Sequence, residues 1–207
     1  MMNEDYMKKI YEEIDKVLSE KDSVREVAIK SSRAIGRLSA RAIWKIHKGE
    51  DPLDELKEAK EEVWHLKSIL KENYPDIYYA GYVLNALQEF CEAQIFYSIV
   101  RKGRIPSPSE LSVHPEAYLL GLADVIGELR RTVVENLRAG NIEKAEEMFV
   151  IMESIYELIM QFSYPNAIVP IKNKQDAARN IIERTRADIM VIKSQENLRK
   201  ELENISK

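Results

Sequence analysis

The stretch IYYAGYVLNALQEFCEAQIFYSIV, residues 77–100, decides the fold class of this chain. It runs for 24 residues without a proline, and its only charged side chains are Glu89 and Glu92. Its length and apolar character indicate a buried helix, because a membrane span would hardly carry two carboxylates. A second apolar stretch, AYLLGLADVIGEL at residues 117–129, has the same character, and its only charges are Asp124 and Glu128.

The composition of the whole chain also favours helices. The 207 residues include 7 glycines and 7 prolines, well below the usual share of ~12%. A β-sandwich or a Rossmann fold would need more turns and glycines, and a hydrophobic content of 45% excludes a disordered chain. We therefore predict an all-α fold: a single-domain bundle of about seven long antiparallel helices over residues 1–207.

Glycines, prolines and capping residues divide the sequence into the predicted helices. The main loop is predicted at 104–115, RIPSPSELSVHP, with one short helical turn, and a second loop at 164–170. Asn141 and Asn173 are expected to cap the last two helices. The predicted helices cover residues 3–21, 22–48, 53–73, 76–102, 116–139, 141–163 and 173–200.

Cysteine usage and the N-terminus bear on the cellular compartment. Cys91 is the only cysteine, which excludes an intramolecular disulfide and a zinc site built on several thiolates. The N-terminal sequence MMNEDYMKKIYEEID is acidic and amphipathic and lacks the apolar core of a signal peptide. We expect a cytoplasmic protein that has no contact with a membrane.

Positive charge gathers on the second predicted helix. Residues 23–48 carry seven Lys or Arg against the single acid Glu26, so this segment is +6 while the chain as a whole is −4. At 100° per residue most of these cations fall within an arc of roughly 120°, and Trp44 lies inside it. Such a rod of positive charge suits the phosphates of RNA or single-stranded DNA. The predicted nucleic-acid-binding residues are Lys30, Arg33, Arg37, Arg41, Lys45 and Lys48.

Two other interpretations of this basic surface are open. It could bind the acidic surface of a protein partner, or it could be an ordinary solvated helix face. A solvated face commonly alternates charge signs at i,i+4 spacing, and this one lacks the acids to do so. Trp44 by itself is a weak signal and is expected to serve packing or subunit contact.

The two acidic pairs predict a metal site. The i,i+3 spacing of Glu89 and Glu92 and the i,i+4 spacing of Asp124 and Glu128 each put two carboxylates on one helix face. Carboxylates in apolar surroundings are costly unless they are paired, hydrogen-bonded or bound to metal. Oxygen ligands without His or Cys suit Mg²⁺ or Mn²⁺, which could activate water for phosphodiester or pyrophosphate hydrolysis. In the alternative interpretation each acid is exposed, or is bonded to a Tyr or Arg of another helix.

Other catalytic constellations are weak. His47, His65 and His114 are scattered and are expected to be structural or solvent-facing. The phosphate-binding patterns GxxxxGK[ST] and GxGxxG do not occur in the sequence. Cys91 is expected to be a small core residue rather than a nucleophile.

With these residues in view, the chain resembles the translin superfamily, and most of all its translin-associated factor X branch. The resemblance rests on YLLGLADVIGELRR (118–131), on the E-x-x-E helix QEFCEA (88–93) and on the basic helix VREVAIKSSRAIGRLSARAIWKIHK (24–48). The chain is shorter than the eukaryotic factor X proteins and lacks their basic N-terminal extension. That difference suits a prokaryotic, archaeal homologue. If the same cell makes no translin partner, the shell would be a homo-octamer.

The resemblance implies an all-α fold, a hollow octameric shell that holds RNA or single-stranded DNA, and metal-dependent ribonuclease activity. Carried over, the catalytic acids are Glu89, Glu92 and Asp124, and Glu128 joins them as a metal ligand. The leading hypothesis is therefore a Mg²⁺- or Mn²⁺-dependent endoribonuclease. A shell that binds nucleic acid without cutting it, like translin itself, is the first alternative.

The second alternative is an all-α nucleoside triphosphate pyrophosphatase. Those enzymes also place an E-x-x-E pair and a second acidic pair on adjacent helices. In this chain the second pair is D-x-x-x-E instead of E-x-x-D, and the long basic helix face would have no use.

Overall fold

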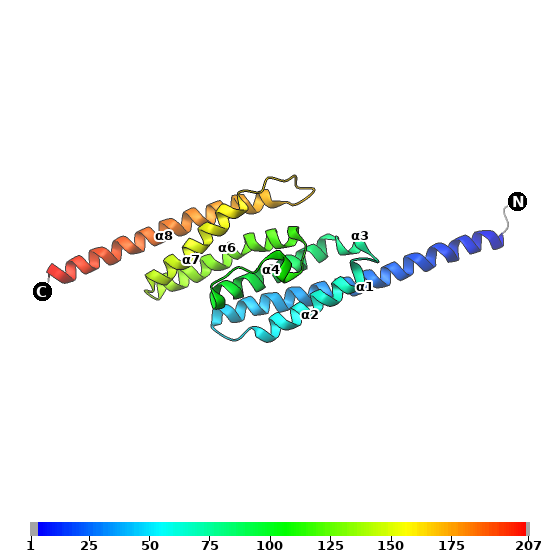
Figure 1. Ribbon diagram of the computed structural model, residues 1–207, viewed down its shortest axis with the longest axis horizontal. Helices are drawn as coiled ribbons and strands as arrows, with labels where there is room; N and C mark the ends of the chain where they lie inside the picture. Colours follow the sequence, from blue (N-terminus) through cyan, green and yellow to red (C-terminus); the bar gives the residue numbers. More distant parts are fainter. Residues whose placement is uncertain (1–3, 206–207) are drawn as a thin grey trace.

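The computed structural model describes residues 4–205, and every regular element in that range is a helix (Figure 1). The all-α prediction is confirmed. The long helices are α1 (Glu4–Lys48), α2 (Leu53–Leu70), α4 (Gly81–Lys102), α6 (Pro115–Arg138), α7 (Ile142–Ile159) and α8 (Ile171–Ile205). Two single-turn helices, α3 (Pro75–Tyr78) and α5 (Pro108–Leu111), lie in the connections.

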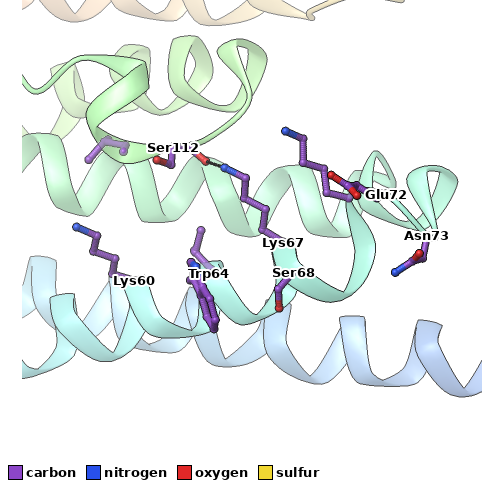
Figure 2. A pocket seen from close by; sticks show the side chains of 10 residues that line it. Lys60, Trp64, Lys67, Ser68, Glu72, Asn73 and Ser112 are labelled. Atoms are coloured by element: carbon purple, nitrogen blue, oxygen red, sulfur yellow. Dashed lines mark hydrogen bonds between the residues drawn. The ribbon is translucent and has the colours of Figure 1, made fainter.

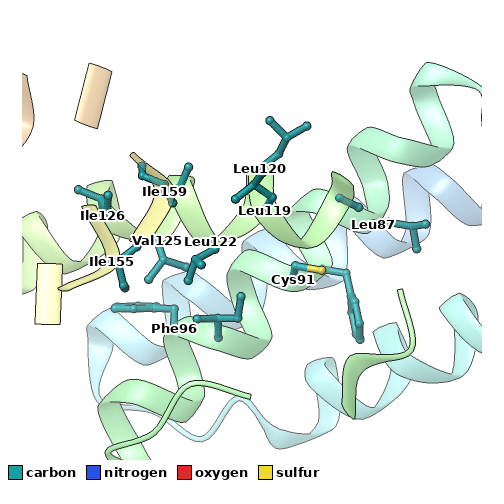
Figure 3. Packing of buried hydrophobic residues seen from close by; sticks show 14 of the residues in the cluster. Leu87, Cys91, Phe96, Leu119, Leu120, Leu122, Val125, Ile126, Ile155 and Ile159 are labelled. Atoms are coloured by element: carbon teal, nitrogen blue, oxygen red, sulfur yellow. The ribbon is translucent and has the colours of Figure 1, made fainter. Parts of the chain in front are cut away.

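Helices α4 and α6 pack on each other in the middle of the bundle. On one side α1 covers α4 and carries α2, and on the other side α7 and α8 pack on α6 and on each other (Figure 1). Burial of apolar side chains between these layers drives the assembly. Figure 3 shows the centre of this core, with Leu87 and Phe96 of α4, Leu122 and Val125 of α6, and Ile155 of α7.

The predicted break between residues 21 and 22 is wrong, because α1 is one helix of 45 residues. Ser23 could cap a new helix, but its hydroxyl donates to the carbonyl of Ser19, 2.9 Å away and one turn earlier. Asp22 pairs with Arg25 across the same turn, at 2.9 Å. The side chains at the expected break therefore support a continuous helix, and six long helices replace the seven predicted within residues 4–205.

Three other boundaries differ from the prediction. The helix expected at 76–102 is interrupted where Ala80 takes an extended conformation, so that α3 and α4 are separate. The helix expected to reach 163 ends at Ile159, because the Gln175 side-chain amide donates to the carbonyls of Ile159 and Phe162. The last helix begins at the buried Ile171, which places Asn173 inside it rather than at its cap.

The two terminal helices extend beyond the bundle in opposite directions (Figure 1). We call residues 4–19 of α1 the N-terminal arm and residues 194–205 of α8 the C-terminal arm. Each arm exposes apolar side chains at helical spacing. These are Met7, Tyr11, Ile14 and Leu18 on the N-terminal arm, and Leu198, Leu202 and Ile205 on the C-terminal arm. No helix within residues 4–205 is both long and apolar enough to cross a membrane.

The contact between α4 and α6 is closest at Gly121. A Cβ atom at this position would lie 2.6 Å from the Gln88 carbonyl oxygen, 2.7 Å from the Cys91 Cβ and 3.1 Å from the Glu92 nitrogen. Two of these atoms belong to backbone and cannot move aside cheaply. Glycine at 121 therefore sets the separation of the two central helices.

We expect Gly121→Ala to destabilise the fold by about 1–3 kcal/mol, the typical cost of overpacking a core. Gly127→Ala is the matched control, because it lies on the same helix and its added Cβ meets nothing within 4 Å. That control should be neutral or slightly stabilising, since alanine favours helices. Urea unfolding followed by circular dichroism measures both, and equal stability of the two variants would contradict the assignment.

Candidate active site

The close α4–α6 contact brings the two predicted acidic pairs together. Gly121 lies three residues before Asp124 on α6, and the α4 backbone atoms it approaches belong to Gln88 and Glu92. Asp124 and Glu128 are consequently close enough to act electrostatically on Glu92, as does Glu89 from the preceding turn of α4. The structure thus brings the acids of the two predicted pairs within electrostatic range of Glu92.

Glu92 is partly buried beside the other acids. Partial burial raises its pKa to about 8, and the negative charges of Asp124, Glu128 and Glu89 add to the shift. The Lys174 ammonium opposes it. Within residues 4–205 no hydrogen bond or ion pair reaches the Glu92 carboxyl, so this group is held next to like charges without a direct counter-ion.

Asp124 receives its partners from two other parts of the chain. Lys174, in the first turn of α8, places its Nζ 2.5 Å from Asp124 Oδ1, and Gln88 of α4 donates to Oδ2 at 2.5 Å. Sequence reasoning missed both residues. Gln88 is adjacent to Glu89 but carries no charge, and Lys174 is 50 residues away in the sequence. Only the folded chain shows that α8 supplies a cation to the site.

Glu128 is paired with a histidine at the end of α1. His47 Nε2 lies 2.5 Å from Glu128 Oε2, and its Nδ1 lies 3.8 Å from Glu135 Oε2. The His47 side chain is only 2% exposed and rests against the Phe96 ring at 4.9 Å between centroids. His47 is thus buried as a structural histidine would be, and it contacts one of the predicted metal ligands.

The four acids offer carboxylate oxygens as metal ligands, and Mg²⁺ and Mn²⁺ prefer such ligands. Glu92 supports this fit, because a partly buried carboxyl that lacks a counter-ion and faces three other acids is a natural ligand for a divalent cation. As the side chains stand, no three His, Cys, Asp or Glu groups in the described range converge closely enough to hold a metal ion. Lys174 and His47 contact oxygens of Asp124 and Glu128.

Glu89 faces a different space from Glu92. It lines a cavity of about 590 Å³ between α1 and α4, together with Arg33 and Arg37 of the basic helix. The cavity forms because α1 has a glycine opposite Glu89: a Cβ at Gly36 would lie 2.7 Å from Glu89 Oε2. A carboxylate and two guanidinium groups therefore share one solvent-filled hollow.

The predicted nucleic-acid-binding residues differ in whether their positive charges are already paired with an acid. Lys30, Arg33, Arg37 and Lys48 are exposed and take part in no ion pair within residues 4–205. Arg41 Nε and Lys45 Nζ, however, lie 3.1 and 2.7 Å from the buried Glu55 of α2. Lys45 above all holds the pKa of that carboxyl below its usual range. The free positive charge thus concentrates around Arg33 and Arg37, next to Glu89.

The raised pKa of Glu92 predicts how the stability of the fold depends on pH. The unfolded carboxyl ionises near pH 4.5 and the folded one near pH 8, so the folded state binds more protons between these values. Wild-type stability should therefore fall as pH rises through this window. Glu92→Gln removes the ionisation, and without divalent cations we expect it to exceed wild type at pH 8 by at least about 1 kcal/mol.

Urea unfolding in EDTA at pH 5 and pH 8 measures this difference. Glu116→Gln, on α6 but outside the site, is the control and should keep the wild-type pH dependence. If the free energy of unfolding fell equally for Glu92→Gln and wild type between pH 5 and pH 8, Glu92 would not be the group that opposes folding at high pH.

Comparison with known proteins places this chain in a family. A model of the Translin family matches residues 21–187. An uncharacterized protein of Methanocaldococcus jannaschii is 41% identical over 192 residues, which cover 91% of this chain and 85% of the relative.

Solved structures agree with this match. The crystal structure of AfC3PO superposes with a TM-score of 0.82 at 37% identity, covering 89% of this chain and 97% of that one. The structure of an AfC3PO–duplex RNA complex gives a TM-score of 0.74 at 34% identity over 89% and 96% of the two chains. The crystal structure of apo-NeC3PO gives 0.72 at 26% identity over 93% and 98%. The chain belongs to the Translin family.

Proposed function

We propose that this protein binds RNA and hydrolyses it with the help of a divalent cation, as a cytoplasmic endoribonuclease. The observation that carries the proposal is the cavity shared by Arg33, Arg37 and Glu89, one helical turn from Glu92. It puts groups that attract phosphate beside groups that attract cations. The structural match to a duplex RNA complex of AfC3PO supports the RNA-binding part.

Each group has a role that follows from its place. Arg33 and Arg37 hold the RNA phosphates over the cavity, because guanidinium groups pair well with phosphate oxygens. Glu92, Asp124 and Glu128 would hold Mg²⁺ or Mn²⁺ with help from Glu89. Such an ion, when bound, supplies an activated water and neutralises charge on the phosphate. Glu89 is exposed and faces the arginines, so it is also placed to accept a proton from the attacking water.

Lys174 and His47 are positioning residues in this proposal. In the present arrangement Lys174 forms an ion pair with Asp124, and His47 lies within hydrogen-bond distance of Glu128. Lys174 is about one-third exposed and can swing away from Asp124 to contact RNA phosphate. The same chemistry would accept single-stranded DNA phosphates at the arginines, so DNA binding is part of the proposal.

Cleavage of labelled RNA in Mg²⁺, in Mn²⁺ and in EDTA tests the proposal. Glu89→Ala and Asp124→Ala should reduce cleavage at least about 100-fold, as expected when a catalytic group is lost. Both should still bind RNA. Arg33→Glu with Arg37→Glu should weaken RNA binding and flatten its salt dependence, whereas Arg41→Glu should do less because Arg41 is already paired with Glu55.

The control for cleavage is Glu116→Gln, which should match wild type. Tight RNA binding without cleavage in either metal would contradict the nuclease and favour a shell that only binds nucleic acid. Cleavage that persists in both acid variants would remove the assignment of the site.

We further propose that copies of this chain assemble through the two arms, as a homo-octamer. The arms leave the bundle in opposite directions (Figure 1). Each exposes an apolar seam with the 4-3 spacing of helices that pack together. Exposed apolar surfaces of this kind mark protein contacts. A second copy of the chain is the natural occupant, since both arms offer the same type of seam.

Tyr11→Glu with Leu18→Glu should lower the mass of the assembly, measured by light scattering after size-exclusion chromatography. Both side chains are exposed, so the fold of the single chain should survive. Lys9→Glu with Lys16→Glu changes charge on the opposite face of the same arm and should leave the mass unchanged. An unchanged mass in the Tyr11 and Leu18 variant would exclude this seam from the assembly.

A further inference from the structure

A second cationic surface lies on α2, away from the four acids. It surrounds a cavity of about 600 Å³ between α2 and the segment that follows α5 (Figure 2). Residues 60, 64, 67 and 71 repeat at helical spacing and therefore lie on one face. They are Lys60, Trp64, Lys67 and Lys71, and Ser68, Asn73 and Ser112 add polar groups to the lining.

The three lysines of this cavity are free to attract an anion. Within residues 4–205 none of them has a carboxylate within 4.0 Å, although Glu72 is also part of the lining. Lys67 Nζ donates to the Ser112 carbonyl at 3.1 Å, which fixes its direction across the cavity (Figure 2). A hydrogen bond to a neutral carbonyl leaves the positive charge of Lys67 uncompensated.

Trp64 gives this cavity an aromatic platform. Its side chain lies between Lys60 and Lys67 along α2 (Figure 2), and the residue is 72% exposed. A large indole left in water on a helix flanked by free lysines is the combination that binds unpaired bases, with stacking on the ring and phosphates on the cations. Bases inside a duplex already stack on each other, so only an unpaired segment can use the ring.

The α2 surface is continuous with the RNA-binding region of α1. Trp64 also lines a neighbouring cavity of about 810 Å³ that contains Arg37 and Arg41. Arg37 in turn lines the cavity of Glu89. Shared residues therefore link the three cavities in a row. The middle cavity also carries Glu58, Glu61 and Glu62, which repel phosphate, so a strand that crosses it must keep its backbone on the arginine side.

We propose that Trp64 and the lysines Lys60, Lys67 and Lys71 form a docking site for a single-stranded RNA extension. One unpaired base stacks on the Trp64 indole, and the adjoining phosphates contact the lysines. The site rests on the proposed function, because it receives the strand that leaves the arginines of α1. It extends that function by selecting RNA that has an unpaired end.

The test compares two RNAs in EDTA: a blunt duplex, and the same duplex with an extension of about ten uridines. Trp64→Ala should weaken binding of the extended duplex at least about fivefold and leave the blunt duplex unaffected. Lys71→Glu should also weaken binding of the extended RNA and lower its salt slope by about 0.7 per lost phosphate contact. Lys144→Glu on α7 makes the same charge change elsewhere and should have little effect.

A fluorescence measurement separates this site from the α1 surface. Trp44 and Trp64 are the two tryptophans, so Trp44→Phe leaves Trp64 as the only one. Oligouridine should quench its emission. Unquenched emission, or equal losses for both RNAs in Trp64→Ala, would overturn the docking site while leaving the proposed function intact. Quenching by oligouridine without any binding of duplex RNA would instead contradict the α1 surface.

Discussion

The close approach of Gly121 to the α4 backbone at Gln88 and Glu92 is the constraint on which the rest of the structure depends. It brings α6 against α4 so closely that Asp124 and Glu128 act on the Glu92 carboxyl. Apolar packing of the two helices on both sides of this contact supplies the free energy that holds the acids together. The same helix contact therefore forms both the central core of the bundle and the candidate active site.

The accumulated negative charge explains why the outer helices contribute to the site. His47 comes from the last turn of α1, and Lys174 comes from the first turn of α8. Each contacts one acid of α6. Ion pairs often add little net stability, so stability alone does not account for this arrangement. The account given by the proposed function is that the acids are held ready for a divalent cation, with the protein's own cations as temporary partners.

The sequence predicted the helical class, the main loop with its short turn, and the two acidic pairs, because these depend on local patterns. The single turn at 108–111 follows from Ser107 and Glu110, which form a capping box. Contacts between distant segments could not be predicted in this way. The pairing of Glu55 with Arg41 and Lys45 requires the position of α2 on α1, and the part of Lys174 requires the return of α8 to α6. The continuity of α1 was missed because Ser23 can either cap a helix or bond back into one.

The central claim is that the four carboxylates form a site for a divalent cation. Titration of Mn²⁺ into the protein, followed by electron paramagnetic resonance of the free ion, tests it without RNA or turnover. The account predicts that wild type removes Mn²⁺ from solution and that Glu92→Gln and Asp124→Asn bind it far more weakly, while Glu116→Gln behaves as wild type. Equal Mn²⁺ binding by all four proteins, or none by wild type, would contradict it.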